Sequence, residues 1–98
     1  MITNGLPPIH PGEMLQEILE DLHVNETDFA DAIGVSSTQV TNILKGTHPI
    51  TAELALRLSR AFKQTPQYWL NLQTGYDLKI AQSECKDSLA KVREIAAI

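Results

Sequence analysis

Apolar residues recur at spacings of three and four over most of the chain, a pattern that predicts amphipathic helices. The first such segment follows a proline-rich stretch, residues 6–12, which favours an extended arm because residues before proline avoid the helical region. Acidic residues fall mostly on the opposite side of this segment, so we predict one helix with a buried stripe. The stripe consists of Met14, Leu15, Ile18, Leu19 and Leu22.

Two short helices are predicted next, over residues 25–33 and 36–45. Asn25 and Ser36 are residue types that cap helix N-termini, and Gly34 can end the first of these helices in a left-handed conformation. Lys45 and Gly46 close the second helix. The turn between the two helices is too short for them to lie antiparallel. The inward residues of the second helix are Val40, Ile43 and Leu44.

A fourth and a fifth helix are predicted next, with Thr51 and Thr65 as their N-caps and Pro66 as the first residue of the fifth. The fifth is apolar on more than one side, which is typical of a helix that packs against two partners. One partner is its own core, and we expect the other to be a second copy of the chain. The sequence thus predicts an all-α fold with an extended arm at residues 1–10, a five-helix domain at residues 11–80, and a helical or frayed tail at residues 81–98.

Composition indicates a single small soluble domain. The chain has 98 residues, 43% of them apolar, and no apolar run long enough to span a membrane. Its first residues lack the basic start and the apolar run of a secretory signal, and the single cysteine, Cys85, fits a reducing compartment. We therefore expect a cytoplasmic protein that does not bind membranes.

Charge is unevenly distributed along the chain. The net charge is −4, all eight lysines and arginines come at or after Lys45, and seven acidic residues precede it. A DNA-facing surface must therefore be local rather than a broad basic belt. The acidic segment from Glu13 to Asp31 is interpreted as a solvated face or, alternatively, as a contact for a basic protein partner.

The outward side of the helix at residues 36–45 indicates a function. Two short helices joined by a tight glycine-containing turn are typical of a helix-turn-helix, whose second helix enters the major groove of DNA. Asn and Gln can pair with adenine, Ser and Thr can bond several bases, and the Thr methyl can touch thymine. The alternative is an ordinary polar face in solvent. The candidate DNA-binding residues are Ser37, Thr38, Gln39, Thr41, Asn42 and Lys45.

Sequence blocks on both sides of this motif occur together and in a fixed order. They are HPGE at residues 10–13, ITAELALRL at 50–58 and WLNLQ at 69–73, beside residues 25–36 and 40–46 of the motif itself. With them the chain resembles the Xre family of the lambda-repressor and Cro type and, more closely, its HigA-type (VapI-like) antitoxins. The resemblance implies a five-helix lambda-repressor-like domain that forms a homodimer, represses its own promoter through a palindromic operator, and neutralises a HigB-type, RelE-like ribonuclease toxin.

By position, the resemblance assigns base contacts to Ser37, Thr38, Thr41 and Asn42, and contacts to the DNA backbone to Gln39 and Lys45. Two positions depart from the family pattern: Glu26 stands where relatives often have a phosphate-binding Gln, and Asn42 where they often have Arg. Both changes weaken the attraction to phosphate. The alternative function is therefore a protein-interaction module of the same fold, with weak or no DNA binding, that acts mainly by toxin capture.

No enzymatic activity is predicted. The chain has no nucleophile–base pair, no metal-ligand spacing and no glycine-rich phosphate loop, so we expect neither a catalytic residue nor a metal, cofactor or small-molecule substrate. His10, His23 and His48 are scattered and do not form a metal set. The segment from His10 to Glu13 is interpreted as helix initiation, with Glu13 near the positive end of the first helix.

Aromatic and basic residues near the C-terminal half leave two interpretations open. Trp69 and Tyr76 stack on bases or, as their place in an apolar helix favours, pack in the core or at an interface. Arg57, Arg60 and Lys63 contact phosphate or are solvated surface charges.

Overall fold

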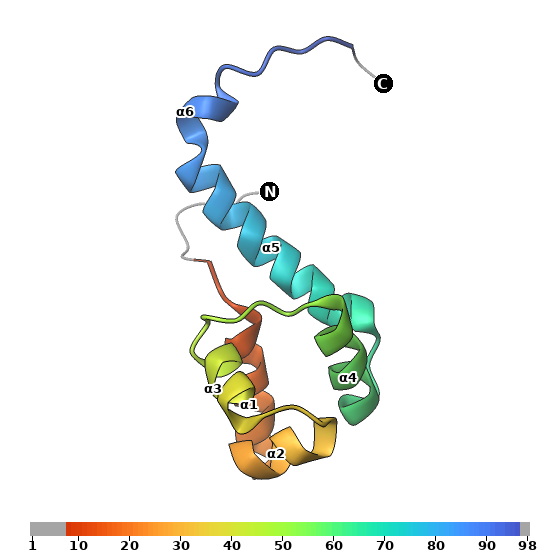
Figure 1. Ribbon diagram of the computed structural model, residues 1–98. Helices are drawn as coiled ribbons and strands as arrows, with labels where there is room; N and C mark the ends of the chain where they lie inside the picture. Colours follow the sequence, from red (N-terminus) through yellow and green to blue (C-terminus); the bar gives the residue numbers. More distant parts are fainter. Residues whose placement is uncertain (1–7, 97–98) are drawn as a thin grey trace.

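The structure is a computed structural model that describes residues 8–96, and within that range the chain is helical without strands (Figure 1). The helices are α1 (Pro11–Leu22), α2 (Glu26–Ile33), α3 (Ser37–Leu44), α4 (Ala52–Phe62), α5 (Pro66–Glu84) and α6 (Lys86–Leu89). The predicted all-α fold is confirmed. Among the described residues, no helix has both the length and the apolar character needed to cross a membrane.

Local capping explains where the first five helices begin. The side chains of Asn25, Ser36, Thr51 and Thr65 each accept a hydrogen bond from a backbone N–H in the first turn of the helix that follows. These four N-caps are the predicted ones, and they satisfy donors that a helix N-terminus otherwise leaves unpaired. His10 caps α1 in the same way, which confirms the interpretation of residues 10–13 as helix initiation.

Helices α1 to α4 and the start of α5 enclose one hydrophobic core. Aromatic rings link its helices: Phe29 of α2 stacks on Phe62 of α4 at 5.5 Å between centroids, and Phe62 lies 6.2 Å from Trp69 of α5. Trp69 is completely buried, which confirms packing rather than base stacking for this residue. The buried apolar residues are Leu15, Leu19, Phe29, Ala30, Ile33, Val40, Ile43, Ile50, Leu54, Ala55, Leu58 and Trp69.

One residue of the predicted α1 stripe lies outside this core. Leu15 and Leu19 are buried and Met14 and Ile18 pack against the core, but Leu22 is 55% exposed. The prediction that Leu22 is buried is wrong. The chain turns directly after it, at residue 23 with φ 57°, so the stripe extends past the last position that the neighbouring helices cover.

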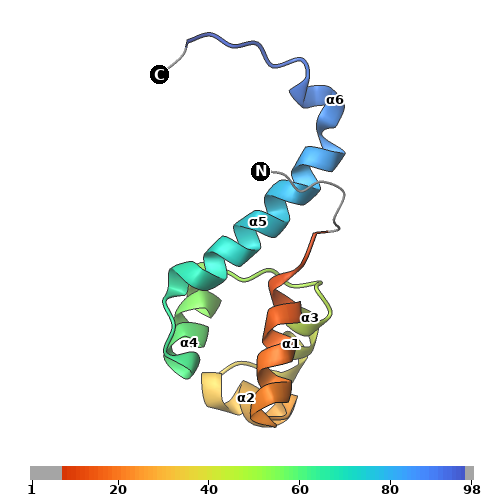
Figure 2. The same cartoon turned by 180° about the vertical axis from the view of Figure 1, so that it is seen from behind.

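Helix α5 leads away from the body formed by α1–α4 and places α6 at the end farthest from α2 (Figures 1 and 2). Only its first half packs on the core, through Trp69 and its neighbours, while Leu78 is 56% exposed. The helix crosses the predicted domain boundary at residue 81 without a break and is followed by the single turn α6. Residues 92–96 form no helix, and of the predicted arm only residues 8–10 lie within the described range.

Candidate nucleic-acid interface

The turn between α2 and α3 has the predicted left-handed glycine. Gly34 has φ 76°, and its N–H donates to the carbonyl oxygen of Ala30 at 2.9 Å, while the N–H of Val35 donates to the same oxygen at 3.0 Å. Ser36 then caps α3 through a 3.0 Å hydrogen bond from the Gln39 N–H. Glycine adopts this positive φ without the strain that a side chain would add, so only three residues separate the end of α2 from the start of α3.

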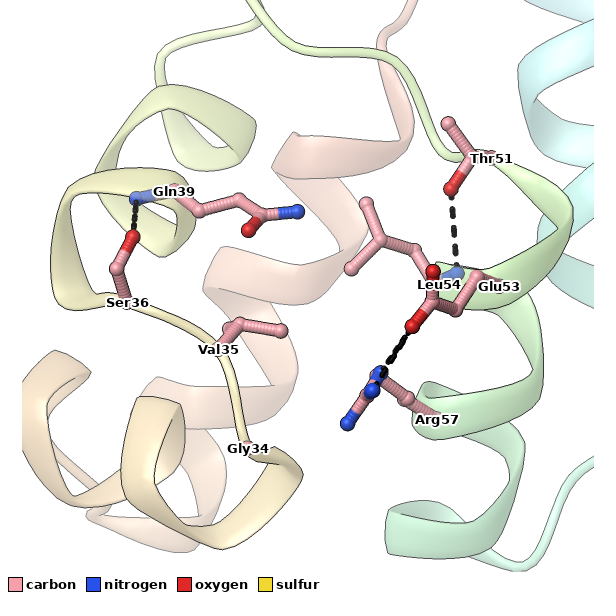
Figure 3. A pocket seen from close by; sticks show the side chains of 8 residues that line it. All are labelled: Gly34, Val35, Ser36, Gln39, Thr51, Glu53, Leu54 and Arg57. Carbon is pink, nitrogen blue, oxygen red and sulfur yellow. Dashed lines mark hydrogen bonds and ion pairs between the residues drawn. The ribbon is translucent and has the colours of Figure 1, made fainter.

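Arg57 of α4 holds this turn in place (Figure 3). Its Nη1 donates to the carbonyl oxygen of Ile33 at 2.7 Å, and its Nε and Nη2 donate to Glu53 at 3.2 and 2.8 Å. The guanidinium thus donates to a carbonyl oxygen at the C-terminus of α2 that would otherwise lack a partner. Glu53, one turn earlier on α4, fixes the position of the guanidinium itself. The sequence left Arg57 open as either a phosphate contact or a solvated surface charge. In the structure its guanidinium instead bonds to Glu53 and to the Ile33 carbonyl and stabilises the turn.

The inward side of α3 is tightly fixed. Val40 and Ile43 are completely buried, as predicted, and Leu44 packs against the core from a half-buried position. The first turn of α1 lies so close to the end of α3 that a Cβ atom at Gly12 would overlap the carbonyl oxygen of Ile43. This close approach leaves α3 little freedom to shift relative to the body.

The candidate DNA-binding residues occupy three different environments on α3. Ser37 and Thr38 in its first turn and Lys45 at its C-cap are exposed, while Thr41 and Asn42 are half-buried. Gln39 is also half-buried, and its side chain extends from α3 toward α4 (Figure 3). It lines a cavity of about 340 Å³ with Arg57 and Thr51, so it lies to one side of the other candidates.

Thr41 is connected to the start of α2. Its hydroxyl donates to the Oε1 atom of Glu26 at 2.7 Å, which joins the first residue of α2 to the middle of α3. A hydroxyl–carboxylate hydrogen bond of this length is among the strong, charge-assisted kind. In the sequence Glu26 is notable as a departure from the family pattern. Its contact with Thr41 could not be predicted from the sequence, because no local pattern links residues 15 positions apart.

Two polar residues outside α3, His10 and Gln73, are buried in the fold. The Nδ1 atom of His10 accepts from the Gly12 N–H at 2.9 Å, and its ring lies edge-on to Tyr76 of α5 at 4.9 Å between centroids. Gln73 accepts from the Ile50 N–H at 2.7 Å and donates to Asp77 at 2.9 Å. The ring contact connects α5 to the start of α1, and the Gln73–Ile50 hydrogen bond connects α5 to the loop after α3. No local pattern in the sequence indicates this role of Gln73.

Acidification is expected to destabilise the fold through His10. Burial lowers the pKa of this imidazole, although the carboxylates of Asp77 and Glu13 raise it in part and His48 lowers it further. A protonated ring also has no acceptor for the Gly12 N–H. Below the ordinary pKa of histidine, about 6.5, the unfolded chain therefore binds a proton at this ring that the folded chain does not bind. The free energy of unfolding decreases as the pH is lowered through this range.

Urea unfolding between about pH 7.5 and about pH 5.5 measures this dependence. His10→Asn retains a good N-cap without a titrating ring, so its stability should change less over the range than that of the parent chain. His23→Asn, at an exposed left-handed position, is the control and should keep the parent's pH dependence. An unchanged slope in His10→Asn would show that His10 does not cause the effect.

The chain is similar to known proteins in both sequence and structure. The pattern of the helix-turn-helix family matches residues 15–69. The chain is 43% identical over 82 residues to Virulence-associated protein I of Dichelobacter nodosus, which covers 83% of this chain and 76% of the relative. It is also similar to a solved addiction module antidote protein of a HigA family from Coxiella burnetii, with a TM-score of 0.88 and 39% identity over 93% of this chain and all of that one.

A third comparison includes DNA. The solved Pseudomonas aeruginosa antitoxin HigA with the higBA promoter matches with a TM-score of 0.86 and 33% identity, over 91% of this chain and 99% of that one. At these levels of sequence identity, the chain and the two solved proteins share the fold and the order of the helices. The matched region contains α2, the turn and α3.

Proposed function

Because the chain belongs to the helix-turn-helix family, and within it to the HigA-type antitoxins, we propose that it is a dimeric autorepressor that also neutralises a HigB-type, RelE-like ribonuclease toxin. In this proposal α3 enters the major groove of an operator at the chain's own promoter, in the cytoplasm. A related antitoxin has been solved with its promoter.

The polar side of α3 supports the DNA-binding part of this proposal. Val40 and Ile43 fix one side of the helix in the core, which leaves Thr38, Thr41 and Asn42 on the surface that remains. Hydroxyl and amide groups of these types can bond base edges without carrying charge. Since Glu26 and Asp28 occupy the first turn of α2, attraction to phosphate is weakened and contacts to base edges must supply more of the affinity.

The second half of α5 supports the dimer. It extends from the body (Figure 2). Leu78 in this half is 56% exposed, and Leu89 in α6 is 52% exposed. A second copy would cover apolar side chains that otherwise face water. A symmetric dimer would also present two copies of α3 to a palindromic operator, whose half-sites lie about 34 Å apart or at a multiple of that spacing.

Binding to the DNA just upstream of the gene tests the repressor proposal. We would measure fluorescence anisotropy of labelled upstream DNA across a salt series, with random DNA as competitor. The expected result is specific binding whose affinity depends only modestly on salt, because few phosphate contacts release few counterions. The absence of any preference for upstream over random DNA at low salt would refute the repressor role.

The second candidate function is a protein-interaction module of the same fold with weak or no DNA binding, which acts mainly by toxin capture. The acidic surface of α1 favours it. Glu17 and Glu20 are exposed on this helix, and every lysine and arginine of the chain comes later. We expect Glu17→Lys with Glu20→Lys to weaken neutralisation of a basic ribonuclease at least about tenfold, because attraction would become repulsion. The readout is inhibition of RNA cleavage by a HigB-type, RelE-like toxin.

The matched control makes the same charge change elsewhere. Glu84→Lys with Asp87→Lys alters two exposed acids at the far end of α5 and in α6, and neutralisation should persist. Because these residues lie in the segment proposed for the dimer, the oligomeric state of this variant is compared with that of the parent. Equal loss in both double variants would indicate that net charge, rather than the α1 surface, attracts the toxin. Unchanged neutralisation in the α1 variant would exclude this surface.

A further inference from the structure

The hydrogen bond between Thr41 and Glu26 limits what Thr41 can offer to DNA. A threonine hydroxyl has a single proton, and here that proton is donated to a carboxylate oxygen at 2.7 Å. An ionised carboxylate only accepts, so the direction of this bond is unambiguous. While the bond exists, Thr41 has no proton for an acceptor on a base edge.

The hydroxyl oxygen can still accept from a base amino group, but the major-groove edge of thymine has an acceptor and a methyl group and no donor. Toward thymine, therefore, Thr41 can present only its own methyl group. In the major groove this group can contact the C5-methyl of thymine, which the other bases lack. Thr38, one turn earlier on α3, provides an internal contrast. It is exposed, and its side chain makes no hydrogen bond of this kind within residues 8–96.

We propose that Glu26 is a specificity-determining residue that acts through Thr41: by accepting the hydroxyl proton it makes Thr41 recognise thymine through its methyl group. This inference rests on the proposed DNA-binding function of α3. Glu26 is a positioning residue here, since a carboxylate at this edge repels phosphate and contributes no attraction of its own. The carboxylate lowers the affinity for DNA and fixes the orientation of the Thr41 side chain.

The experiment substitutes deoxyuridine for each operator thymine in turn, which removes only the C5-methyl. The measured quantity is the ratio of affinities for the unmodified and the substituted operator. The parent chain should lose roughly fourfold at one thymine in each half-site, the change expected for one buried methyl group. Thr41→Ser lacks the methyl and should show no loss at that thymine, whereas Thr41→Val keeps the methyl and should show the same loss as the parent.

Two substitutions of Glu26 separate the hydrogen bond from the charge. In Glu26→Gln the amide oxygen still accepts the Thr41 proton, so the deoxyuridine effect should remain while overall affinity rises. In Glu26→Ala affinity should also rise, but the released hydroxyl can rotate toward the groove, and the deoxyuridine effect should shrink. Thr38→Val is the control on the same helix and should weaken operator binding through its lost hydroxyl while the Thr41-dependent thymine stays unaffected.

The outcomes distinguish this inference from the function on which it rests. If Thr41→Val abolishes the deoxyuridine effect as Thr41→Ser does, or if no thymine responds to changes at Thr41, the hydroxyl is the recognising group and the inference is overturned. Equal deoxyuridine effects in Glu26→Ala and the parent would also overturn it. Failure of the parent chain to prefer its operator over random DNA would instead refute the proposed function.

Discussion

Replacement of Gly12 by alanine is expected to lower the free energy of unfolding by about 3 kcal/mol, the upper end of the usual cost of overpacking. The added Cβ would overlap the backbone carbonyl oxygen of Ile43. A flexible side chain could rotate away, but a backbone carbonyl in the last turn of α3 can yield only if α1 and α3 separate. Urea denaturation monitored by circular dichroism gives the change directly.

Gly75→Ala provides the matched control, because it makes the same substitution within α5. A Cβ there would meet nothing within 4 Å. Alanine is the better helix former, so this variant should be more stable than the parent by about 0.5–1 kcal/mol. Opposite signs for the two substitutions would show that the close approach of α1 and α3, rather than loss of glycine as such, determines the effect. A change below about 0.5 kcal/mol in Gly12→Ala would contradict the close approach.

Joint replacement of Thr38 and Asn42 by alanine is expected to reduce affinity for the operator roughly 100-fold, since contacts to base edges are each worth about 1–3 kcal/mol. Affinity for random DNA should change little, because neither residue has a charge to offer a phosphate. The two substitutions act on the surface of α3 and should leave the fold intact. Anisotropy titrations with operator and random DNA at one salt concentration measure both quantities.

The control for this pair uses the same residue types on α5. Asn71→Ala with Thr74→Ala removes an exposed amide and an exposed hydroxyl from a helix that the proposal keeps out of the groove. Operator affinity in this variant should equal that of the parent. An equal loss from the α5 pair, or no loss from the α3 pair, would mean that α3 is not the recognition helix.

Helix positions followed from short-range chemistry and were therefore predictable. Asn25, Ser36 and Thr51 cap helices by bonding to backbone atoms only three residues away, so the signal and its effect lie in one short stretch. The left-handed turn at Gly34 is local in the same sense. Leu22 shows the limit of periodicity, because spacing indicates a face of a helix but not how far other helices cover it.

The candidate site was predictable only as a list of side chains. The sequence indicated that Thr38, Thr41 and Asn42 share the polar side of one helix, and their role in binding DNA stays a prediction. It could not indicate that Gln39 extends toward α4, or that Thr41 gives its proton to Glu26. Those facts alter what each residue can offer a base without altering the pattern that identified it.

By itself, then, the sequence determined the helices, their caps and the buried side of α3, all of which depend on residues a few positions apart, and it indicated the family through the order of short blocks along the chain. Only the tertiary structure decided which polar groups meet. Glu26 and Thr41 are 15 residues apart and Arg57 and the Ile33 carbonyl are 24 apart. No local pattern encodes such pairs, because each forms only after packing of the core has brought separate helices together.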